Sequence, residues 1–447
     1  MNGGLRMNKA DKQQMLANAK AELSQTAAYK TLEAFFDEGQ FSEVDALTVS
    51  ENGFTEGIAA YGTANGCPVF AFAQNSDIAG GAMSKAQAAK IKKLYDMAEK
   101  TGTPIVGFYD SVGARLKQGA DMLSSFGRIL NSIGTLSGVV PQISVVLGPC
   151  LGTAALCAAS ADFVILTEKA ELSLNTDGQA VSVKENARQG ISHITAKNTA
   201  DAIAQAKGLL AYLPANNLSV APIADAFDAA DAHSGDVMQS VFDSDSLFEL
   251  QKEYGQGVVT AFARLYGSSV GVIVTNGGTM SGEACEKAAR FVRFCDAFAL
   301  PVITFADCEG FESVKDAAKL TAAYTDATTI KATVITGEAY GAFYMAVAGT
   351  GANTDLTLAW TDASVSALAP ITGASIVWED KMNVPAKERE ALVEEYKNTQ
   401  CSVFQAAAQG YVENVINPEE TRQSLFAALD MLAGKRVTTL PKKHGTI

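Results

Sequence analysis

Residues 89–110, AKIKKLYDMAEKTGTPIVGFYD, have a counterpart later in the same chain at residues 286–307, EKAARFVRFCDAFALPVITFAD. In each stretch a helical pattern ends at a proline and runs into an apolar strand whose last residue is aspartate. Pro104 therefore corresponds to Pro301, and Asp110 corresponds to Asp307. Self-similarity of this kind is typical of a duplicated structural unit. The sequence predicts two domains of similar fold.

A second pair of matching stretches extends the repeat. The stretch ISVVLGPCLGTAALCAASADFVILTEKAELSL matches ATVITGEAYGAFYMAVAGTGANTDLTLAWTDASVSAL, so Gly148 corresponds to Gly337 and Gly152 to Gly341. Each copy has the order strand, helix, strand, glycine turn, helix, strand, with the β-branched strands of βαβ units. The chain is therefore expected to be an α/β protein.

The domain boundary is predicted from the segment between the two copies. Residues 197–249 follow the first copy, and the stretch PANN at 214–217 together with the acidic loop at 243–245 is typical of a connection. We expect one domain at residues 1–215 and the other at residues 216–447.

Composition excludes several classes of function. The chain has 447 residues, of which 48% are hydrophobic, so it has enough apolar material for the cores of two domains. Its formal net charge of -14 argues against general binding to nucleic acid or to an anionic membrane, which need a positive surface. An anionic ligand would need cations that are gathered locally.

The cysteines and the apolar stretches indicate a cytoplasmic protein. Seven cysteines are scattered without a CxxC pair, which argues against a disulfide framework or a zinc ribbon and fits a reducing compartment. The polar N-terminus lacks the apolar core of a signal peptide and predicts a surface helix. The apolar stretch from Ser137 to Leu166 is broken by prolines and glycines, so it predicts a buried strand, turn and helix.

The glycine turns are the candidate functional sites. They lie in LGPCLGTAA, residues 147–155, and TGEAYGAFY, residues 336–344, where a strand passes into a helix. Free N–H groups at a helix N-terminus favour negative charge, and such donors can stabilise the oxyanion of a thioester enolate. Glycine can also serve only to let a helix pack closely on a sheet. Because the turn occurs twice, both interpretations stay open with about equal weight.

Other catalytic constellations find no support in the sequence. His193, His233 and His444 are far apart and have no metal or triad spacing, so each is expected to be a surface or packing residue. There is no G-x-S-x-G elbow, P-loop or G-x-G-x-x-G motif after a strand. No metal site is predicted.

Two basic features are candidates for contact with nucleotide phosphates. One is a helix with several lysines after Gly80 and Gly81, and the other follows the turn at residues 111–115. The alternative for the lysines is a solvated helix face. The residues concerned are Lys85, Lys90, Lys92, Lys93, Arg115 and Lys117.

Several ordered motifs carry a resemblance to a known family. They are GGAMSKAQAAKIKKLYDMAEKTGTPIVGFYDSVGARLKQGADML, SGVVPQISVVLGPC, AYLPANN, KAARFVRFCDAFALPVITFADCEGF and LPKKHGTI. Together they resemble the carboxyltransferase subunits of biotin-dependent acyl-CoA enzymes, from Ala28 to the end of the chain. This family includes the β subunits of propionyl-CoA and acetyl-CoA carboxylases and the α subunits of methylmalonyl-CoA and glutaconyl-CoA decarboxylases.

The resemblance implies a fold and an activity. The fold is a tandem pair of crotonase-like (ClpP/crotonase) domains, of which the N-terminal one binds acyl-CoA and the C-terminal one binds biotin. The activity moves a carboxyl group between an acyl-CoA of the malonyl-, methylmalonyl- or glutaconyl-CoA class and biotin on a separate carrier protein. The resemblance also implies a hexamer, a trimer of dimers, in which the N-terminal domain of one chain faces the C-terminal domain of its neighbour.

The resemblance further implies the site residues. Catalysis is expected to use paired backbone oxyanion holes, one for the thioester enolate and one for the biotin ureido oxygen. The first is placed on Gly152 and Thr153, and the second on Ala342 and Phe343. Met345 is placed where the family tunes substrate preference. The residues expected to line the two ligands are Gly80, Gly81, Ala82, Gly113, Ala114, Gly341 and Met345.

The chain also departs from the family pattern. Val112 stands where the family has a glycine in Ser-Gly-Gly-Ala-Arg, and Thr153 and Ala342 stand where it has the second glycine of each turn. A stretch that the family carries after Phe311 is missing. A catalytically impaired paralogue with a structural or assembly role therefore remains an alternative. A stand-alone crotonase-type enzyme is the other, but Pro141 to Ala161 contains no carboxylate for its chemistry.

The expected partners follow from what the sequence lacks. No A-M-K-M biotinylation motif or ATP-grasp segment occurs, so carboxybiotin is expected to come from a separate biotin carrier protein. Biotin carboxylase subunits, or membrane subunits of a decarboxylase that would hold the chain peripherally on a membrane, are further candidate partners. Neither the acyl group nor the physiological direction follows from the sequence.

Overall fold

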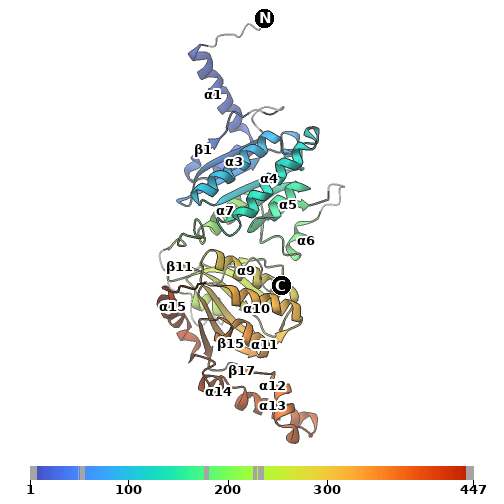
Figure 1. Ribbon diagram of the computed structural model, residues 1–447, viewed down its shortest axis with the longest axis vertical. Coiled ribbons are helices and arrows are strands. Elements are labelled where there is room, and N and C mark those ends of the chain that lie inside the picture. Colours follow the sequence, from blue (N-terminus) through green and yellow to red (C-terminus); the bar gives the residue numbers. More distant parts are fainter. Residues whose placement is uncertain are drawn as a thin grey trace. The chain divides into compact units, whose positions relative to one another are not determined.

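The computed structural model describes residues 8–48, 50, 56–175, 181–224, 229 and 236–438 (Figure 1). The chain forms two compact units, Met1–Ser219 and Val220–Ile447. Each unit contains its own mixed sheet with helices packed on it. The two units are described separately below.

The sheet of the first unit has the strand order β1-β2-β3-β4-β5-β6-β8, and the short strand β7 pairs with β5. Pairing is antiparallel among β1, β2 and β3 and parallel from β3 onward. The parallel strands are almost continuously apolar because both faces of the sheet are covered. The strands are β1 Phe41–Val44, β2 Gly57–Ala64, β3 Cys67–Gln74, β4 Ile105–Ser111, β5 Gln142–Leu151, β6 Phe163–Thr167, β7 Glu171–Ser173 and β8 Ile194–Ala196.

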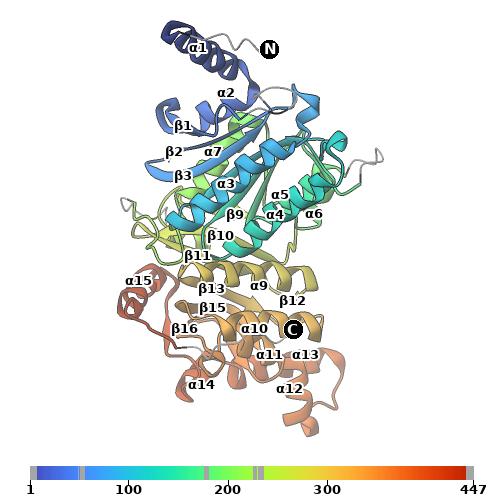
Figure 2. The same ribbon diagram turned by 45° about the horizontal axis from the view of Figure 1, so that its top comes forward.

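Helices α3 and α4 lie side by side on one face of this sheet, with α7 across the sheet from α3 (Figure 2). The residues explain where α3 begins and ends: Ser84 caps its N-terminus through the Gln87 N–H, and Gly102 ends it in the left-handed conformation. The helices are α1 Lys9–Gln25, α2 Ala27–Phe35, α3 Lys85–Thr101, α4 Asp121–Leu136, α5 Thr153–Ala159, α6 Val183–Arg188 and α7 Thr199–Leu210.

The second unit repeats this arrangement. Its sheet has the order β18-β16-β15-β13-β11-β10-β9, and the short strand β17 pairs with β15 as β7 pairs with β5. The strands are β9 Phe248–Leu250, β10 Val258–Leu265, β11 Ser268–Thr275, β13 Val302–Cys308, β15 Lys331–Tyr340, β16 Leu356–Trp360, β17 Ser364–Ser366 and β18 Asn414–Ile416, and β12 Thr279–Met280 pairs separately with β14 Gly310–Phe311.

The helices of the second unit include counterparts and additions. Helices α9, α10 and α11 follow their strands as α3, α4 and α5 do, and α10 is the shorter of its pair. Helices α12 and α13 are additions near the end of the chain. The bounds are α8 Val237–Val241, α9 Gly282–Ala297, α10 Val314–Asp326, α11 Gly341–Val347, α12 Pro370–Val377, α13 Ala386–Gln400, α14 Val403–Ala408 and α15 Thr421–Leu432.

The fold confirms the predicted tandem α/β duplication. The strand, turn and helix predicted within Ser137–Leu166 are β5, α5 and β6, and the predicted surface helix is α1, most of which is exposed. Within the described residues, no helix has the length and hydropathy needed to cross a bilayer. The interpretation of residues 197–249 as a linker is wrong in part, because α7 packs against β5 and β6 of the first sheet.

Candidate functional site

Three segments meet at the carboxyl end of the first sheet, where parallel α/β sheets usually bind ligands. The loop after β3 bonds to the loop after β4: the Val112 N–H donates to Gly80 O at 2.9 Å and the Met83 N–H to Gly113 O at 2.9 Å. The second loop also lies against the end of β5, because Ser111 pairs with Cys150. The structure thus brings the predicted Gly80, Gly81, Ala82, Gly113 and Ala114 close to the first glycine turn.

Gly81 shows how tightly these loops are packed. Its φ is +70°, and a Cβ atom there would lie 1.9 Å from Asp110 O. Any other residue would displace the backbone of β4 at the edge of the site. Glycine is required here for both reasons.

The first glycine turn differs from the prediction in one respect. The Gly152 N–H donates to Ser173 O at 2.8 Å, because the pairing of β5 with β7 continues into the turn. In this structure the Gly152 N–H is thus occupied by a backbone carbonyl. Within the described residues, the N–H groups of Thr153 and Ala114 have no hydrogen-bond partner.

The replaced glycines do not strain the two turns. Thr153 is the first residue of α5 and Ala342 the second residue of α11, and neither has a positive φ. Each therefore presents its backbone N–H in the first helical turn without the penalty that a Cβ atom brings in the left-handed region. This removes one objection to an active site.

The second unit contains a glycine loop that the sequence analysis missed. GGTMS at residues 277–281 corresponds to GGAMS at residues 80–84. A hydrogen bond joins the same two loops, shifted by one residue: the Glu309 N–H donates to Gly278 O at 2.7 Å, whereas the Val112 N–H donates to Gly80, the counterpart of Gly277. Met280 pairs with Phe311 as Met83 bridges to Ala114. Comparing the two pentapeptides directly would have found this signal.

The second glycine turn exposes some predicted residues and buries others. Ala342 is exposed, whereas Phe343 is fully buried with its ring 5.8 Å from that of Phe311. Met345 is 58% exposed on α11, and its repeat counterpart Leu156 is 44% exposed on α5. Each turn thus carries an exposed apolar side chain one helical turn beyond its first N–H groups.

Arg115 has a structural partner rather than a free guanidinium. Its Nη2 lies 2.8 Å from Glu56 Oε1, and both side chains are almost completely buried. Ser84 Oγ donates to the other Glu56 oxygen at 2.5 Å. The predicted phosphate contact of Arg115 is therefore wrong, because the charge is already paired inside the protein. Lys90 is also buried and donates to Gly57 O at 3.4 Å.

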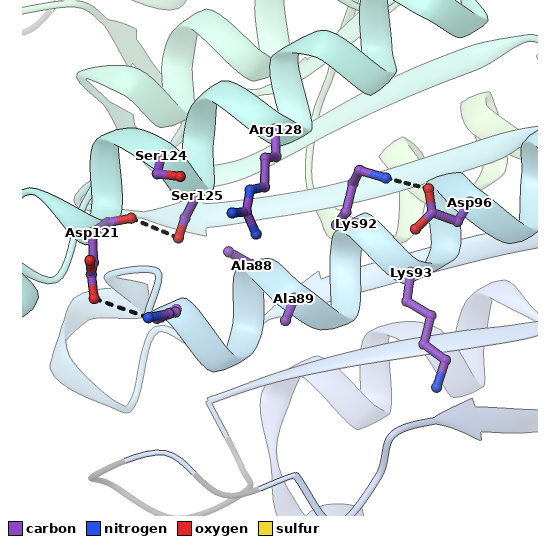
Figure 3. Close-up of a pocket in the computed structure, with 10 residues that line it drawn as sticks. Ala88, Ala89, Lys92, Lys93, Asp96, Asp121, Ser124, Ser125 and Arg128 are labelled. Carbon is purple, nitrogen blue, oxygen red and sulfur yellow. Dashed lines mark hydrogen bonds and ion pairs between the residues drawn. The ribbon is translucent and has the colours of Figure 1, made fainter.

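Lys85, Lys92 and Lys93 of α3 line a groove of about 290 Å³ between α3 and α4 (Figure 3). Lys85 pairs with Asp121 at 3.0 Å, Lys92 pairs with Asp96, and Arg128 extends from α4 into the groove. Lys93 also lines the groove but pairs with Asp45 at 2.6 Å, so among the described residues Arg128 is the groove cation that has no carboxylate partner. An anionic group would therefore meet Arg128 here, although the net charge of the whole chain is negative.

One titratable group near each turn has a shifted pKa, for a different reason in each unit. Desolvation raises the pKa of Asp110, with the nearby Asp77 charge adding to it and a hydrogen bond from Ser76 opposing it. In the second unit, the hydrogen bond that Lys397 donates to the Glu338 carboxylate raises the pKa of Lys397. Lys397 Nζ, on α13, lies 2.7 Å from Glu338 Oε1, on β15.

His193 is a packing residue, as expected. It is buried, its Nδ1 accepts the Val164 N–H at 3.1 Å, and its ring meets that of Phe163 edge-on. His233 and His444 lie outside the described residues. Across the part of the chain that the structure describes, no three His, Cys, Asp or Glu side chains gather as metal ligands would.

A family model described as the carboxyl transferase domain matches residues 23–447. The chain belongs to the carboxyl transferase family. The resemblance inferred from the sequence motifs is thereby confirmed. The match includes both glycine turns and both glycine loops, so the duplicated architecture belongs to this carboxyl transferase fold.

Two curated relatives of this carboxyl transferase are similar over most of their length. The α subunit of methylmalonyl-CoA decarboxylase from Veillonella parvula is 35% identical over 87% of this chain and 84% of its own. The carboxyltransferase subunit of propionyl-CoA carboxylase from Haloferax mediterranei is 32% identical over 94% of this chain and 93% of its own.

A solved structure has the same fold. The hexameric transcarboxylase 12S, determined with hydrolysed methylmalonyl-coenzyme A bound, superposes on this carboxyl transferase with a TM-score of 0.91. The two chains are 30% identical, and the alignment covers 99% of each. The expected crotonase-like fold is confirmed over both units.

Proposed function

We propose that the chain transfers a carboxyl group between a short-chain acyl-CoA and biotin on a separate carrier protein. The observation that carries this proposal is the presence of equivalent glycine turns in both halves of a chain that matches the carboxyl transferase family almost throughout. Each half thus has one place where a developing oxyanion would meet a helix N-terminal N–H group.

The first unit is proposed to hold the acyl-CoA. The N–H groups of Thr153 and Ala114 are the candidate donors to the thioester oxygen, because they lie on adjoining segments and have no partner among the described residues. Donors fixed by the fold before the reaction stabilise an enolate without reorganisation, which is the main catalytic contribution expected from such a site. Leu156 lies exposed beside them and would contact the acyl group.

The cationic groove between α3 and α4 is a candidate site for the nucleotide phosphates of the same ligand. Arg128 provides its positive charge, because Lys92 and Lys93 are paired with Asp96 and Asp45, and α3 begins directly after the Gly80–Gly81 loop. Phosphate groups bind to such clusters through charge-assisted hydrogen bonds. Arg128→Ala would then weaken acyl-CoA binding while the turnover number stays the same.

The second unit is proposed to receive the biotin ring. Biotin supplies a ureido group that accepts and releases a carboxyl group, and its carbonyl oxygen needs hydrogen-bond donors. Two features support this proposal. Gly278, in the glycine loop, has a positive φ and open space where a Cβ atom would stand, and Ala342 is an exposed residue in the first turn of α11. Met345 is the candidate residue for substrate preference.

The complete enzyme is proposed to be a symmetric oligomer that works with a biotin carrier. The 12S relative is a hexamer, and a closed arrangement of this kind satisfies every head-to-tail contact. Biotin carboxylase or membrane decarboxylase subunits are the further partners that would set the direction of transfer. A cytoplasmic location, with or without attachment to a membrane complex, fits these partners.

A transfer assay tests the proposal. Purified protein is incubated with malonyl-CoA, methylmalonyl-CoA or glutaconyl-CoA and free biotin, and loss of the carboxyl group from the thioester is followed by mass spectrometry. We expect biotin-dependent loss with at least one substrate. A folded protein that binds these thioesters but never transfers their carboxyl group to biotin would support the impaired paralogue instead.

A further inference from the structure

The carboxylate of Asp307 lies beside the strand that carries the second glycine turn. Asp307 is in β13, at the point where the pairing with β15 is irregular: Ala306 pairs with Ile335, but Cys308 pairs with Ala339. A single residue of β13 therefore lies opposite Thr336, Gly337 and Glu338. Irregular pairing of this kind leaves backbone groups without their usual partners.

At the same place β15 changes its partner on its other side. It pairs with β16 as far as Ile335 and with β17 from Glu338 onward. Between these residues the strand has lost regular pairing on both edges. The three residues that follow lead directly into Gly341, so the direction of the strand here determines where the first turn of α11 points.

The Asp307 side chain takes the place of the missing strand partner. Its Oδ1 accepts the Glu338 N–H at 2.8 Å. The backbone of Asp307 is fixed by two further hydrogen bonds. The Asp307 N–H donates to Thr275 Oγ1 at 2.8 Å, and Asp307 O accepts the Gly277 N–H at 2.8 Å. Gly337 makes room for it, since a Cβ atom there would lie 2.3 Å from Oδ1.

The Glu338 side chain is held from a different element. Its Oε1 accepts a hydrogen bond from Lys397 of α13 at 2.7 Å. Glu338 is therefore fixed through its N–H by β13 and through its carboxylate by α13, three residues before the turn. Two independent contacts on one residue restrict the backbone far more than either contact alone.

The first unit has no hydrogen bond equivalent to the one between the Glu338 N–H and Asp307. Asp110 and Gly148 are the repeat counterparts of Asp307 and Gly337, and a Cβ atom at Gly148 would lie 2.5 Å from Asp110 Oδ1. The residue that corresponds to Glu338 is Pro149, which has a fixed φ and no N–H to satisfy. The hydrogen bond to Asp307 is thus needed only in the second unit.

We propose that Asp307 is a positioning residue for the second ligand site, acting through the Glu338 backbone to aim the Gly341 turn and its Ala342 N–H. This inference rests on the proposed function for the identity of the ligand, biotin. Its mechanical part concerns only the geometry of β15. The two parts can be tested separately.

The test compares Asp307→Ala with a matched control in the same strand. Asp355 accepts the N–H of Lys331 at 2.8 Å, so Asp355→Ala also removes a carboxylate partner from β15, but at the opposite end of the strand. Asp307→Asn is the conservative variant, because its side-chain oxygen still accepts the Glu338 N–H.

The kinetic measurement is transfer from methylmalonyl-CoA to free biotin at varied concentrations of each. For Asp307→Ala we expect the KM for biotin to rise about tenfold, the usual effect of losing roughly one hydrogen bond, while the KM for methylmalonyl-CoA changes less than about twofold. Asp307→Asn should restore the biotin KM. Asp355→Ala should leave both KM values unchanged, whatever it does to stability.

Hydrogen exchange provides a measurement that does not depend on activity. The amides of residues 336–343 should exchange faster in Asp307→Ala, but not in Asp307→Asn or Asp355→Ala. If the native protein transfers no carboxyl group, the proposed function fails while this exchange still decides whether Asp307 holds the turn. Unchanged exchange in Asp307→Ala, or a biotin KM equal to that of the control, would overturn the proposal.

Discussion

Thr153 and Ala342 are the residues at which the proposed chemistry can be tested one atom at a time. Both residues lie in the first turn of a short helix after a glycine turn. Only their backbone N–H groups are expected to take part. The side chains should therefore be replaceable, whereas the N–H groups should not.

Replacing Thr153 with proline removes the proposed donor and little else. Thr153 is the first residue of α5, and proline is tolerated at this position because its φ already suits the helix. We expect Thr153→Pro to lower the turnover number about a hundredfold, as for loss of one oxyanion donor. Transfer from methylmalonyl-CoA to biotin measures this, with circular dichroism as a check on folding.

The control for this substitution is Thr153→Gly, which keeps the N–H and removes the hydroxyl. Its activity should equal or exceed that of the native protein. If Thr153→Gly loses activity while its fold persists, the hydroxyl takes part in the chemistry and the assignment to the backbone is incorrect.

Lys287 is a buried cation on α9 of the second unit. It donates to three carbonyl oxygens, of Gln251, Tyr254 and Val258, at 2.8 to 3.0 Å. Desolvation lowers the pKa of Lys287 to about 8, and the Glu249 charge opposes this shift. The repeat counterpart, Lys90, also has a lowered pKa for the same main reason.

The direction of this shift predicts how stability depends on pH. Between pH 8 and about 10 the unfolded chain binds more protons at this position than the folded chain, so the free energy of unfolding should rise with pH there. Relative to Lys287→Met, the native protein should gain up to about 3 kcal/mol across that interval. Urea unfolding at pH 8, 9 and 10 measures the difference, and a flat difference would contradict the lowered pKa.

At the scale of secondary structure, the duplication provides matched pairs of elements. Ser84 and Ser281 cap α3 and α9, and each accepts an N–H from the third residue beyond it, at 3.1 and 3.2 Å. Ser84 also donates to the buried carboxylate of Glu56. The two caps are therefore equivalent as caps but differ in their second contact.

Alanine substitutions should separate these two contributions. Ser281→Ala should cost about 1 kcal/mol of stability, the usual value of an N-cap. Ser84→Ala should cost about 1 to 3 kcal/mol more, because Glu56 also loses a buried donor. Urea unfolding followed by tryptophan fluorescence reports Ser281→Ala, since Trp360 and Trp378 both lie in the second unit.

Loss of the Ser84 cap requires a probe in the first unit. Hydrogen exchange of the α3 peptide provides one, with the α9 peptide in Ser281→Ala as its matched comparison. Equal loss of protection in the two helices would show that the contact with Glu56 contributes nothing.

Much of the fold was predictable because each copy of the repeat is a continuous stretch of sequence. The order of strands and helices follows from patterns within single stretches, and the resemblance of the motifs adds the family. The position of Gly152 at a turn could also be inferred. Its donation to Ser173 could not, since it depends on pairing between β5 and β7, which are separated by a helix and another strand.

Two charged residues show a similar limit. Arg115 lies in a polar loop, and nothing near it in sequence indicates that Glu56 will pair with it inside the protein. The hydrogen bond from Glu338 to Asp307 likewise joins residues far apart in the chain. Local patterns indicate which residue types are present at a site, but not which of them are already satisfied by distant partners.

For the molecule as a whole, the first prediction concerns assembly. The 12S relative is a hexamer, and head-to-tail contacts between unlike units give a closed ring or an open fibre. We expect light scattering to give about six times the chain mass of 46.8 kDa. A monomer at micromolar concentration would contradict the proposed assembly.

The second prediction for the whole molecule concerns its thiols. Of the seven cysteines only Cys67 is partly exposed, and the others are buried. Burial raises the pKa of Cys157 and of Cys285 to about 12, so almost none of either is the reactive thiolate at neutral pH. A thiol reagent should modify one cysteine per native chain rapidly, and Cys67→Ser should abolish that reaction. Rapid modification of a second thiol would indicate local opening.

The identical strand order of the two sheets also has an evolutionary consequence. An ancestor of half the present length would have carried one glycine turn. Any mutation in its gene would have appeared in every subunit of its assembly. Once the two copies were joined in one gene, each could mutate alone. The two copies now differ at corresponding positions: Pro149 corresponds to Glu338, and Ala114 corresponds to Phe311. A laboratory selection can therefore alter the glycine turn of one unit while the turn of the other unit keeps its sequence.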